Sequence, residues 1–184
     1  MLRIAERAEV SPATVYNLFQ TKAAILQQVF DRSLSEYGRL VELAPAHDAL
    51  DRIFKAVDIS ASLCRRDPGF YRAMAQSGRS GDLSRSAISE PRIEFWRRMV
   101  AAVRTEGRLV PETDERLVAV TLSQIMRGIF PEWAAGAISA ERLAEETCYG
   151  FTIVLLAYAA GDAVADLTAR LRQLEAALAA RPRI

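Results

Sequence analysis

The residues best suited to chemistry are hydrogen-bonding and aromatic side chains at positions 11–22, SPATVYNLFQTK. If this stretch is helical, Ala13, Tyr16, Asn17 and Gln20 share one face, because they are three, four and seven residues apart. Thr14 lies beside that row. Asparagine can bond an adenine edge, a methyl group can touch thymine, and hydroxyl groups can bond phosphate. The chemistry indicated is recognition of DNA rather than catalysis.

A solvated polar face on an ordinary helical hairpin would give the same pattern, since short helix-turn-helix patterns are weak signals. Lys22 favours DNA. It falls in the first turn of the following helix, where a cation is electrostatically unfavourable. A helix N-terminus that also carries a lysine is a good phosphate site, so a DNA partner would explain this charge.

Patterns typical of enzymes and metal sites are missing from the sequence. His47 is the sole histidine, and Cys64 and Cys148 lie far apart without ligand spacing around them. The H-E-x-x-H, G-x-S-x-G and Gly-rich phosphate-loop motifs do not occur. We therefore expect a protein that is not an enzyme and that needs no cofactor or metal.

The composition describes a globular protein without an overall charge signature. The 184 residues are 51% hydrophobic and carry a formal net charge of +1. Basic residues are concentrated at 65–108, where the arginines either attract an acidic ligand or form a solvated face. The longest apolar run, 147–160, is too short to span a bilayer, and no signal peptide is visible. We expect a cytoplasmic protein with no membrane partner.

Helical signals recur along the chain and strand signals are almost absent, so we predict an all-α protein of about nine helices. Ser11, Thr21, Asp48 and Ser139 are predicted N-caps. The expected helices cover 2–8, 12–19, 22–43, a stretch after Asp48, 68–76, 90–106, 114–130, 140–160 and 163–179. The stretch 77–87, SGRSGDLSRSA, is predicted to be a loop. Helices 114–130 and 140–160 are apolar nearly all round and should be covered on more than one side.

The stretch IAERAEVSPATVYNLFQTKAAIL resembles the DNA-binding signature of TetR/AcrR-family transcriptional regulators. The matching features are Ile4-Ala5, Val10-Ser11, Thr14-Val15-Tyr16, Phe19, and Lys22 before an apolar helix. More loosely, IFPEWAAGAISAERLAEETCYGFTIVLLAY is similar to the last two major helices of that family, where a W-x-x-G turn is common.

The resemblance implies two parts. Residues 1–43 would form a helix-turn-helix DNA-binding domain with a connecting helix, and residues 44–184 an effector-binding and dimerisation domain. Ser11, Ala13 and Asn17 would lie nearest the base edges, and Thr14, Tyr16 and Lys22 would contact phosphates. The protein would then be a ligand-responsive regulator, most often a repressor, that binds a palindromic operator as a homodimer.

Aromatic and methionine side chains in the C-terminal part are candidates for the wall of a site for a small, largely apolar effector. They are Phe70, Met74, Trp96, Met99, Met126, Phe130 and Trp133. Plain core packing explains each one individually as well. Helices 114–130 and 140–160 are the best candidates for a two-fold four-helix interface, where Gly150 and Ala157 would allow close approach.

The sequence departs from the family in two places. The family usually has one more helix before the one that begins here near Leu2. Either a preceding segment is not represented or this helix is lost, and we expect an under-packed DNA-reading part. Glu9 stands where the family often has glycine and places a negative charge near the expected DNA face. The alternative function is a helical small-molecule-binding or scaffold dimer that has lost DNA binding.

Overall fold

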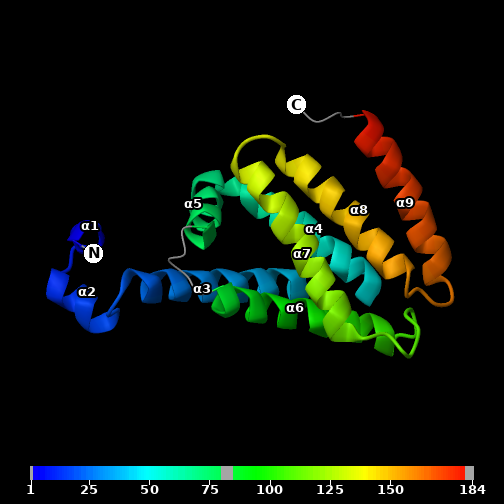
Figure 1. Cartoon of the computed structure of the whole chain (residues 1–184), viewed down its shortest axis with the longest axis horizontal. Helices are drawn as coiled ribbons and strands as arrows, with labels where there is room; N and C mark the ends of the chain where they lie inside the picture. The colour runs from blue at the N-terminus through cyan, green and yellow to red at the C-terminus, as the bar shows by residue number, and fades with distance from the viewer. Residues whose placement is uncertain (1, 80–84, 181–184) are drawn as a thin grey trace.

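The protein is described by a computed structural model that covers residues 2–79 and 85–180. These residues form an all-helical architecture, which confirms the predicted fold class (Figure 1). The helices are α1 (Leu2–Arg7), α2 (Pro12–Leu18), α3 (Lys22–Leu43), α4 (Ala49–Arg66), α5 (Pro68–Arg79), α6 (Arg85–Thr105), α7 (Glu115–Ala134), α8 (Ala140–Leu156) and α9 (Ala163–Ala180). In the described part of the chain, extended pairing is limited to one bridge between Leu109 and Ala159.

Side-chain caps determine where the helices begin. Ser11 accepts a hydrogen bond from the Thr14 amide, and Pro12 occupies the first turn of α2, where its missing N–H costs nothing. The other three predicted caps do the same for α3, α4 and α8: they are Thr21, Asp48 and Ser139. The predicted helix starts are therefore confirmed at these four positions.

The predicted loop at 77–87 is wrong at both ends. Helix α5 continues to Arg79 and α6 already begins at Arg85, while residues 80–84 lie outside the described part. The glycine and serine content of this stretch disfavours helix by only about 1 kcal/mol per residue or less, and its two arginines and one alanine favour helix. Tertiary context therefore decides the boundaries here, and the composition of the stretch does not.

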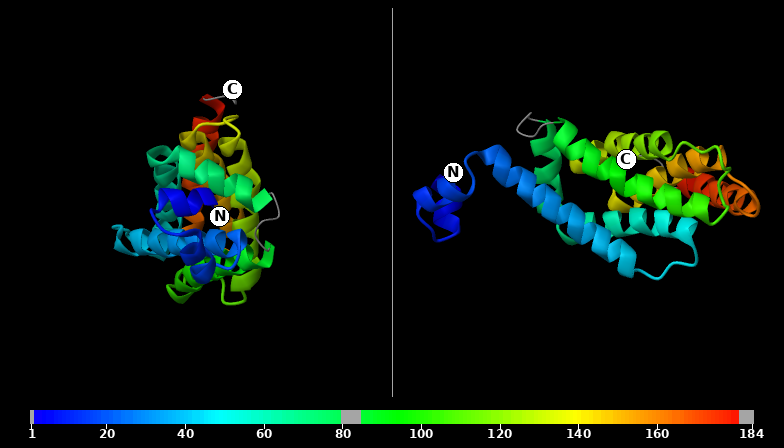
Figure 2. Two further views of the ribbon diagram at one scale, coloured as in Figure 1. Left: turned by 90° about the vertical axis from the view of Figure 1, so that its left-hand side faces the viewer. Right: turned by 90° about the horizontal axis from the view of Figure 1, so that it is seen from below.

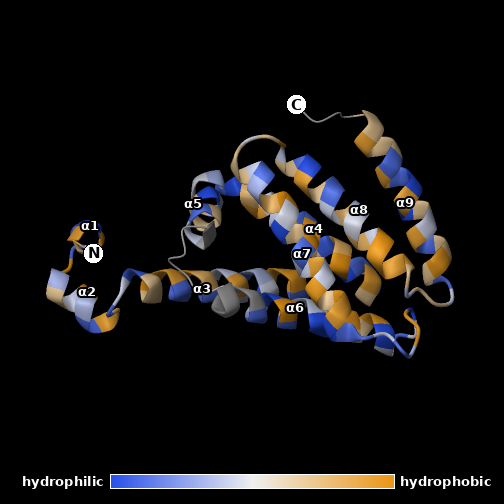
Figure 3. Ribbon diagram, in the orientation of Figure 1, coloured by the Kyte–Doolittle hydropathy of each residue, from blue (hydrophilic) through white to orange (hydrophobic). Residues whose placement is uncertain are grey.

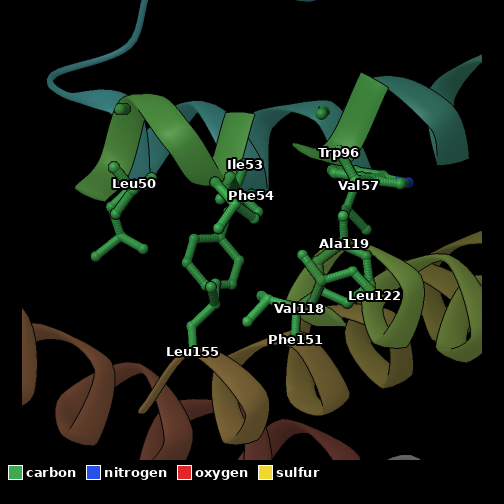
Figure 4. Packing of buried hydrophobic residues seen from close by; sticks show 14 of the residues in the cluster. Leu50, Ile53, Phe54, Val57, Trp96, Val118, Ala119, Leu122, Phe151 and Leu155 are labelled. Atoms are coloured by element: carbon green, nitrogen blue, oxygen red, sulfur yellow. The ribbon is translucent and has the colours of Figure 1, made fainter. Parts of the chain in front are cut away.

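Helix α4 lies at the centre of the body, and its apolar face meets α6, α7 and α8. Figure 4 shows Ile53, Phe54 and Val57 of α4 pointing toward the labelled side chains of the other three helices. Trp96 of α6 is 1% exposed and packs edge-on against Phe151 of α8, with ring centroids 5.0 Å apart. Each such side chain stabilises the fold by about 2 kcal/mol through burial alone. This core is the rigid part against which the remaining helices are placed.

Helices α7 and α8 pack closely against each other and still expose part of their apolar surface. A Cβ atom at Gly150 would lie 2.9 Å from Cγ2 of Ile125 on α7, so this glycine serves close approach within one chain. Leu117 on α7 is 62% exposed and Ile153 on α8 is 46% exposed. Figure 3 shows apolar residues along both helices. The prediction that these helices are covered on several sides is therefore met only partly within the chain.

Helix α3 connects the body to the N-terminal helices. Its C-terminal end is held by Arg52 of α4, whose guanidinium donates to the backbone oxygens of Val41, Glu42 and Ala44 at 3.0, 3.1 and 3.4 Å. Its N-terminal end extends beyond the body and carries α1 and α2, as two perpendicular views show (Figures 1 and 2). Within the described ranges, no helix has the length and apolar character needed to cross a membrane.

Candidate DNA interface and ligand cavity

Helix α2 separates a buried side from an exposed row. Val15 is 4% exposed and faces inward, whereas Ala13, Thr14, Tyr16 and Asn17 are all exposed. Tyr16 exposes 51% of its surface, so its phenol is accessible to a partner. The structure therefore places the predicted base-contacting and phosphate-contacting side chains of α2 on one accessible surface.

Ser11 lies at the start of that surface and also has a structural role. Its hydroxyl oxygen accepts the Thr14 amide at 3.0 Å and lies 2.8 Å from the Thr14 hydroxyl. Both hydroxyl groups are exposed, and each retains capacity for one more hydrogen bond. A contact from Ser11 to DNA would therefore be made by a side chain that the cap already orients.

The turn between α1 and α2 has the geometry of a Schellman motif. The Val10 amide donates to the Ala5 oxygen at 3.0 Å and the Glu9 amide donates to the Glu6 oxygen at 3.2 Å. Glu9 adopts φ +54°, a left-handed conformation that costs a residue with a side chain about 1–2 kcal/mol. The sequence departure at this position is therefore a point of backbone strain.

Two other helix ends show what the same motif normally contains. After α6 and α7 the corresponding residues are Gly107 and Gly136, with φ +73° and +80° and the same pair of backbone hydrogen bonds. Gly136 belongs to the W-x-x-G turn, where its amide donates to the Trp133 oxygen at 2.9 Å. Glu9 thus occupies a position that this chain fills with glycine elsewhere.

The N-terminus of α3 supplies backbone donors next to Lys22. The Thr21 hydroxyl accepts the Ala24 amide at 3.1 Å, which leaves other first-turn amides without an intrahelical partner. Such amides, together with the helix dipole, bind anions, and Lys22 is exposed in the same turn. The arrangement suits a DNA phosphate.

The N-terminal helices themselves bury little apolar surface. In the described parts of α1 and α2, the buried residues are Ala5 and Val15, whereas Leu2, Ile4 and Leu18 are 69%, 39% and 68% exposed. Under-packing of the N-terminal helices was expected from the sequence, and the exposed apolar side chains agree with it.

A cavity of about 380 Å³ lies between α3, α4 and α5. Helix α3 contributes more than half of its lining: Val29, Arg32, Ser33, Glu36, Tyr37 and Leu40. The rest comes from the end of α4 and the start of α5: Leu63, Arg66, Asp67, Phe70 and Tyr71. Its volume is within the range of small-molecule sites, at the lower end.

The polar groups inside the cavity are neutral phenols and a hydroxyl. Tyr37 donates to the Ala56 oxygen at 2.8 Å, and burial raises the pKa of its phenol well above the usual value. Burial also raises the pKa of Tyr71, and a hydrogen bond with Ser33 opposes that rise. Both phenols are therefore protonated at neutral pH, and the cavity presents polar contacts without an internal charge.

The seven predicted effector residues do not meet in this cavity. Trp96 belongs to the main core, and Met99 and Met126 pack against it. Trp133 and Phe130 belong to a second cluster with Cys64, Ile138, Ala140 and Leu143. Phe70 lines the cavity, and Met74 is half-buried on α5. The sequence did not lead us to the six α3 residues that line the cavity. The one signal for them was the phenol of Tyr37, a polar group within an otherwise apolar face of α3.

The two thiols are inert structural groups. Cys64 and Cys148 are buried, and desolvation raises the pKa of each to about 12. A thiol that stays protonated is a poor nucleophile and a poor metal ligand. Over the described ranges, no cluster of three or more His, Cys, Asp or Glu residues could hold a metal ion.

Comparison with known proteins gives one distant relative. The chain is 24% identical over 144 residues to the HTH-type transcriptional repressor KstR of Rhodococcus jostii (strain RHA1). The alignment covers 78% of this chain and 67% of that protein. No protein-family model matches the chain, and no solved structure matches it. The chain is thus similar, at a distance and over most of its length, to a transcriptional repressor.

Proposed function

We propose that the chain is a ligand-responsive, DNA-binding transcriptional regulator of the TetR/AcrR type that acts as a repressor. One observation carries the proposal: the Ser11-capped helix α2 exposes Ala13, Tyr16 and Asn17 in one row, with Thr14 beside it, next to the N-terminus of α3. The distant similarity to a repressor supports it.

In this proposal α2 enters the major groove and α1 crosses the backbone, as in other helix-turn-helix proteins. Ala13 and Asn17 read base edges, assisted by Ser11. Thr14, Tyr16 and the first turn of α3 with Lys22 bind phosphates. The near-neutral charge of this part means that shape and hydrogen bonding contribute more to its affinity than charge does.

A homodimer is part of the proposal. The exposed Leu117 and Ile153 on α7 and α8 are apolar surface that a second copy would cover in a four-helix interface. A two-fold dimer presents two recognition helices to a palindrome whose half-sites are about one helical turn, or about 34–36 Å, apart.

The test is fluorescence anisotropy with the full chain and DNA from upstream of its own gene. Asn17→Ala should weaken binding to the preferred site by about 1–3 kcal/mol and leave other DNA unaffected. Lys22→Gln should weaken binding to all sequences alike. Arg39→Gln, an exposed change further along α3, is the matched control and should change nothing.

Salt dependence gives an independent measure. Residues 1–22 carry three basic side chains, Arg3, Arg7 and Lys22, hence six in a dimer. The slope of log K against log salt concentration should therefore be no steeper than about −5. A much steeper slope would mean that other surfaces bind the DNA.

The second candidate function is a small-molecule-binding or scaffold dimer that does not bind DNA. The exposed Leu2, Ile4 and Leu18 favour it, because an under-packed helix pair positions recognition side chains poorly. A folded dimer that binds none of the upstream DNA would establish this alternative and refute the regulator.

A further inference from the structure

We infer that the cavity between α3, α4 and α5 binds a small anionic amphiphile, a molecule with an apolar body and one acidic head group. The binding site stands on the geometry of the cavity alone. Its use as the effector site rests on the proposed function.

The cavity is uncharged inside, where apolar side chains lie beside two phenols and a hydroxyl, and it is charged at its rim. Val29, Leu40, Leu63 and Phe70 are half-buried, whereas the charged residues that line it are all exposed. An apolar body that enters the cavity removes these half-exposed side chains from water, which is favourable. The volume of about 380 Å³ limits the ligand to a small molecule.

The rim favours a negative head group. Arg32 and Arg66 line the cavity, are exposed, and form no ion pair with any described residue, so their guanidinium groups are available to a ligand. An arginine fork matches a carboxylate or a similar oxyanion in geometry as well as in charge.

Two carboxylates share the rim, and they differ in their surroundings. Asp67 accepts the Phe70 amide at 3.0 Å at the start of α5, where the helix dipole also favours a negative charge. One of its carboxylate oxygens is therefore engaged in the start of α5. Glu36 is the remaining carboxylate and should oppose an anionic ligand.

The position of the cavity gives the site a path to the DNA interface. Six of its lining residues lie on α3, which carries α2 at its other end. A ligand that favours one placement of α3 against α4 and α5 would bias the recognition helix. That bias is limited by the difference between the ligand's affinities for the two placements.

The test is calorimetric titration of the purified full chain, without DNA, with four compounds that share a ten-carbon body. They are decanoate, decanol, decyltrimethylammonium and 2-aminodecanoate, used below their micellar concentrations. Decanoate should bind most tightly, decanol less tightly, and decyltrimethylammonium most weakly. Tighter binding of the cation, or of the zwitterion, would overturn the assignment of an anionic ligand.

Charge variants test the rim directly. Arg32→Gln and Arg66→Gln should each weaken decanoate binding about two- to fivefold, as for an exposed charge pair, and Glu36→Gln should strengthen it by a similar factor. Arg39→Gln, on α3 but outside the cavity, is the matched control. Equal affinities in all four variants would overturn the role of the rim.

Filling the cavity tests its location. Leu63→Trp should abolish decanoate binding in a protein whose circular dichroism is unchanged. If that substitution unfolds the chain, Phe70→Ala, which enlarges the cavity, should change decanoate affinity, while Val164→Ala, an exposed change on α9, should not. Binding that survives every cavity variant would place the ligand elsewhere. Because no DNA is present, failure of the DNA experiments leaves this result intact.

Discussion

Replacing Glu9 by glycine should stabilise the N-terminal helices. The left-handed conformation at φ +54° costs a residue with a side chain about 1–2 kcal/mol. Glycine adopts it freely but loses more backbone entropy on folding, a cost of about 0.5–1 kcal/mol. The expected net gain is about 1 kcal/mol, and it should appear in the local stability of α1 and α2.

Native-state amide exchange measures that local stability. The Ala8 amide, which donates to Ile4 at 3.0 Å, and the Phe19 amide, which donates to Val15 at 2.8 Å, report on α1 and α2. A gain of about 1 kcal/mol should slow the exchange of both amides about fivefold.

Two further variants separate strain from charge. Glu9→Gln removes the charge and keeps the strain, so amide protection should not change. Glu9→Asn removes the charge and tolerates the left-handed conformation, so it should resemble glycine. All three should strengthen DNA binding alike, if the charge is what opposes it. Equal protection in the glycine and glutamine variants would refute the strain argument.

The remaining predictions concern a helix cap, close packing and the burial of thiols. Ser11→Ala should destabilise α2 by about 1 kcal/mol, seen as faster amide exchange, while Ser11→Asp should not. In urea unfolding, Gly150→Ala should lower the free energy of unfolding, because overpacking costs about 1–3 kcal/mol against a helix-propensity gain of about 1. At Gly128 an added Cβ atom would meet no atom within 4 Å, so Gly128→Ala should raise the free energy of unfolding by about 1 kcal/mol. If a second copy covers this face, the same substitution should instead weaken the dimer. Because Cys64 and Cys148 keep their protons when folded but ionise near pH 9.0 when unfolded, stability should be complete below pH 9.0 and fall toward about pH 12. The loss at pH 10 should be about 1 kcal/mol per thiol, and a double Cys→Ala variant should lack it.

Local signals predicted the helices of the body and their inward faces. In the sequence, Ile53, Phe54 and Val57 of α4, and Trp96 and Val100 of α6, follow a 3.6-residue period that indicates an inward face, and all are buried. Caps and helical periodicity depend on neighbouring residues only, so a single sequence reveals them.

Helix α3 also has an apolar face in the sequence, but the body covers it less completely. Ile25 and Leu26 are only half-buried, because this part of the helix extends beyond the body. The period of a sequence shows which side is apolar, but it does not show how far a neighbouring helix reaches along it.

The cavity could not be predicted for a related reason. It depends on the angles at which α3, α4 and α5 cross, and these arise from packing across the whole body. The aromatic residues expected around one centre therefore separate into two clusters and a cavity wall. Phe70 alone among the seven lines that wall.

The anchoring of α3 by Arg52 has a geometric consequence. A helix of 22 residues is about 33 Å long, so a tilt of about 5° about its anchored end moves the other end by about 3 Å. In a two-fold dimer the two arms would move in opposite directions, and their tips would separate or approach by about 6 Å. That distance approaches the rise of two base pairs, enough to take two recognition helices out of register with successive turns of the major groove. If the proposed function is right, a rearrangement of the body no larger than one altered side-chain contact would suffice to release the operator.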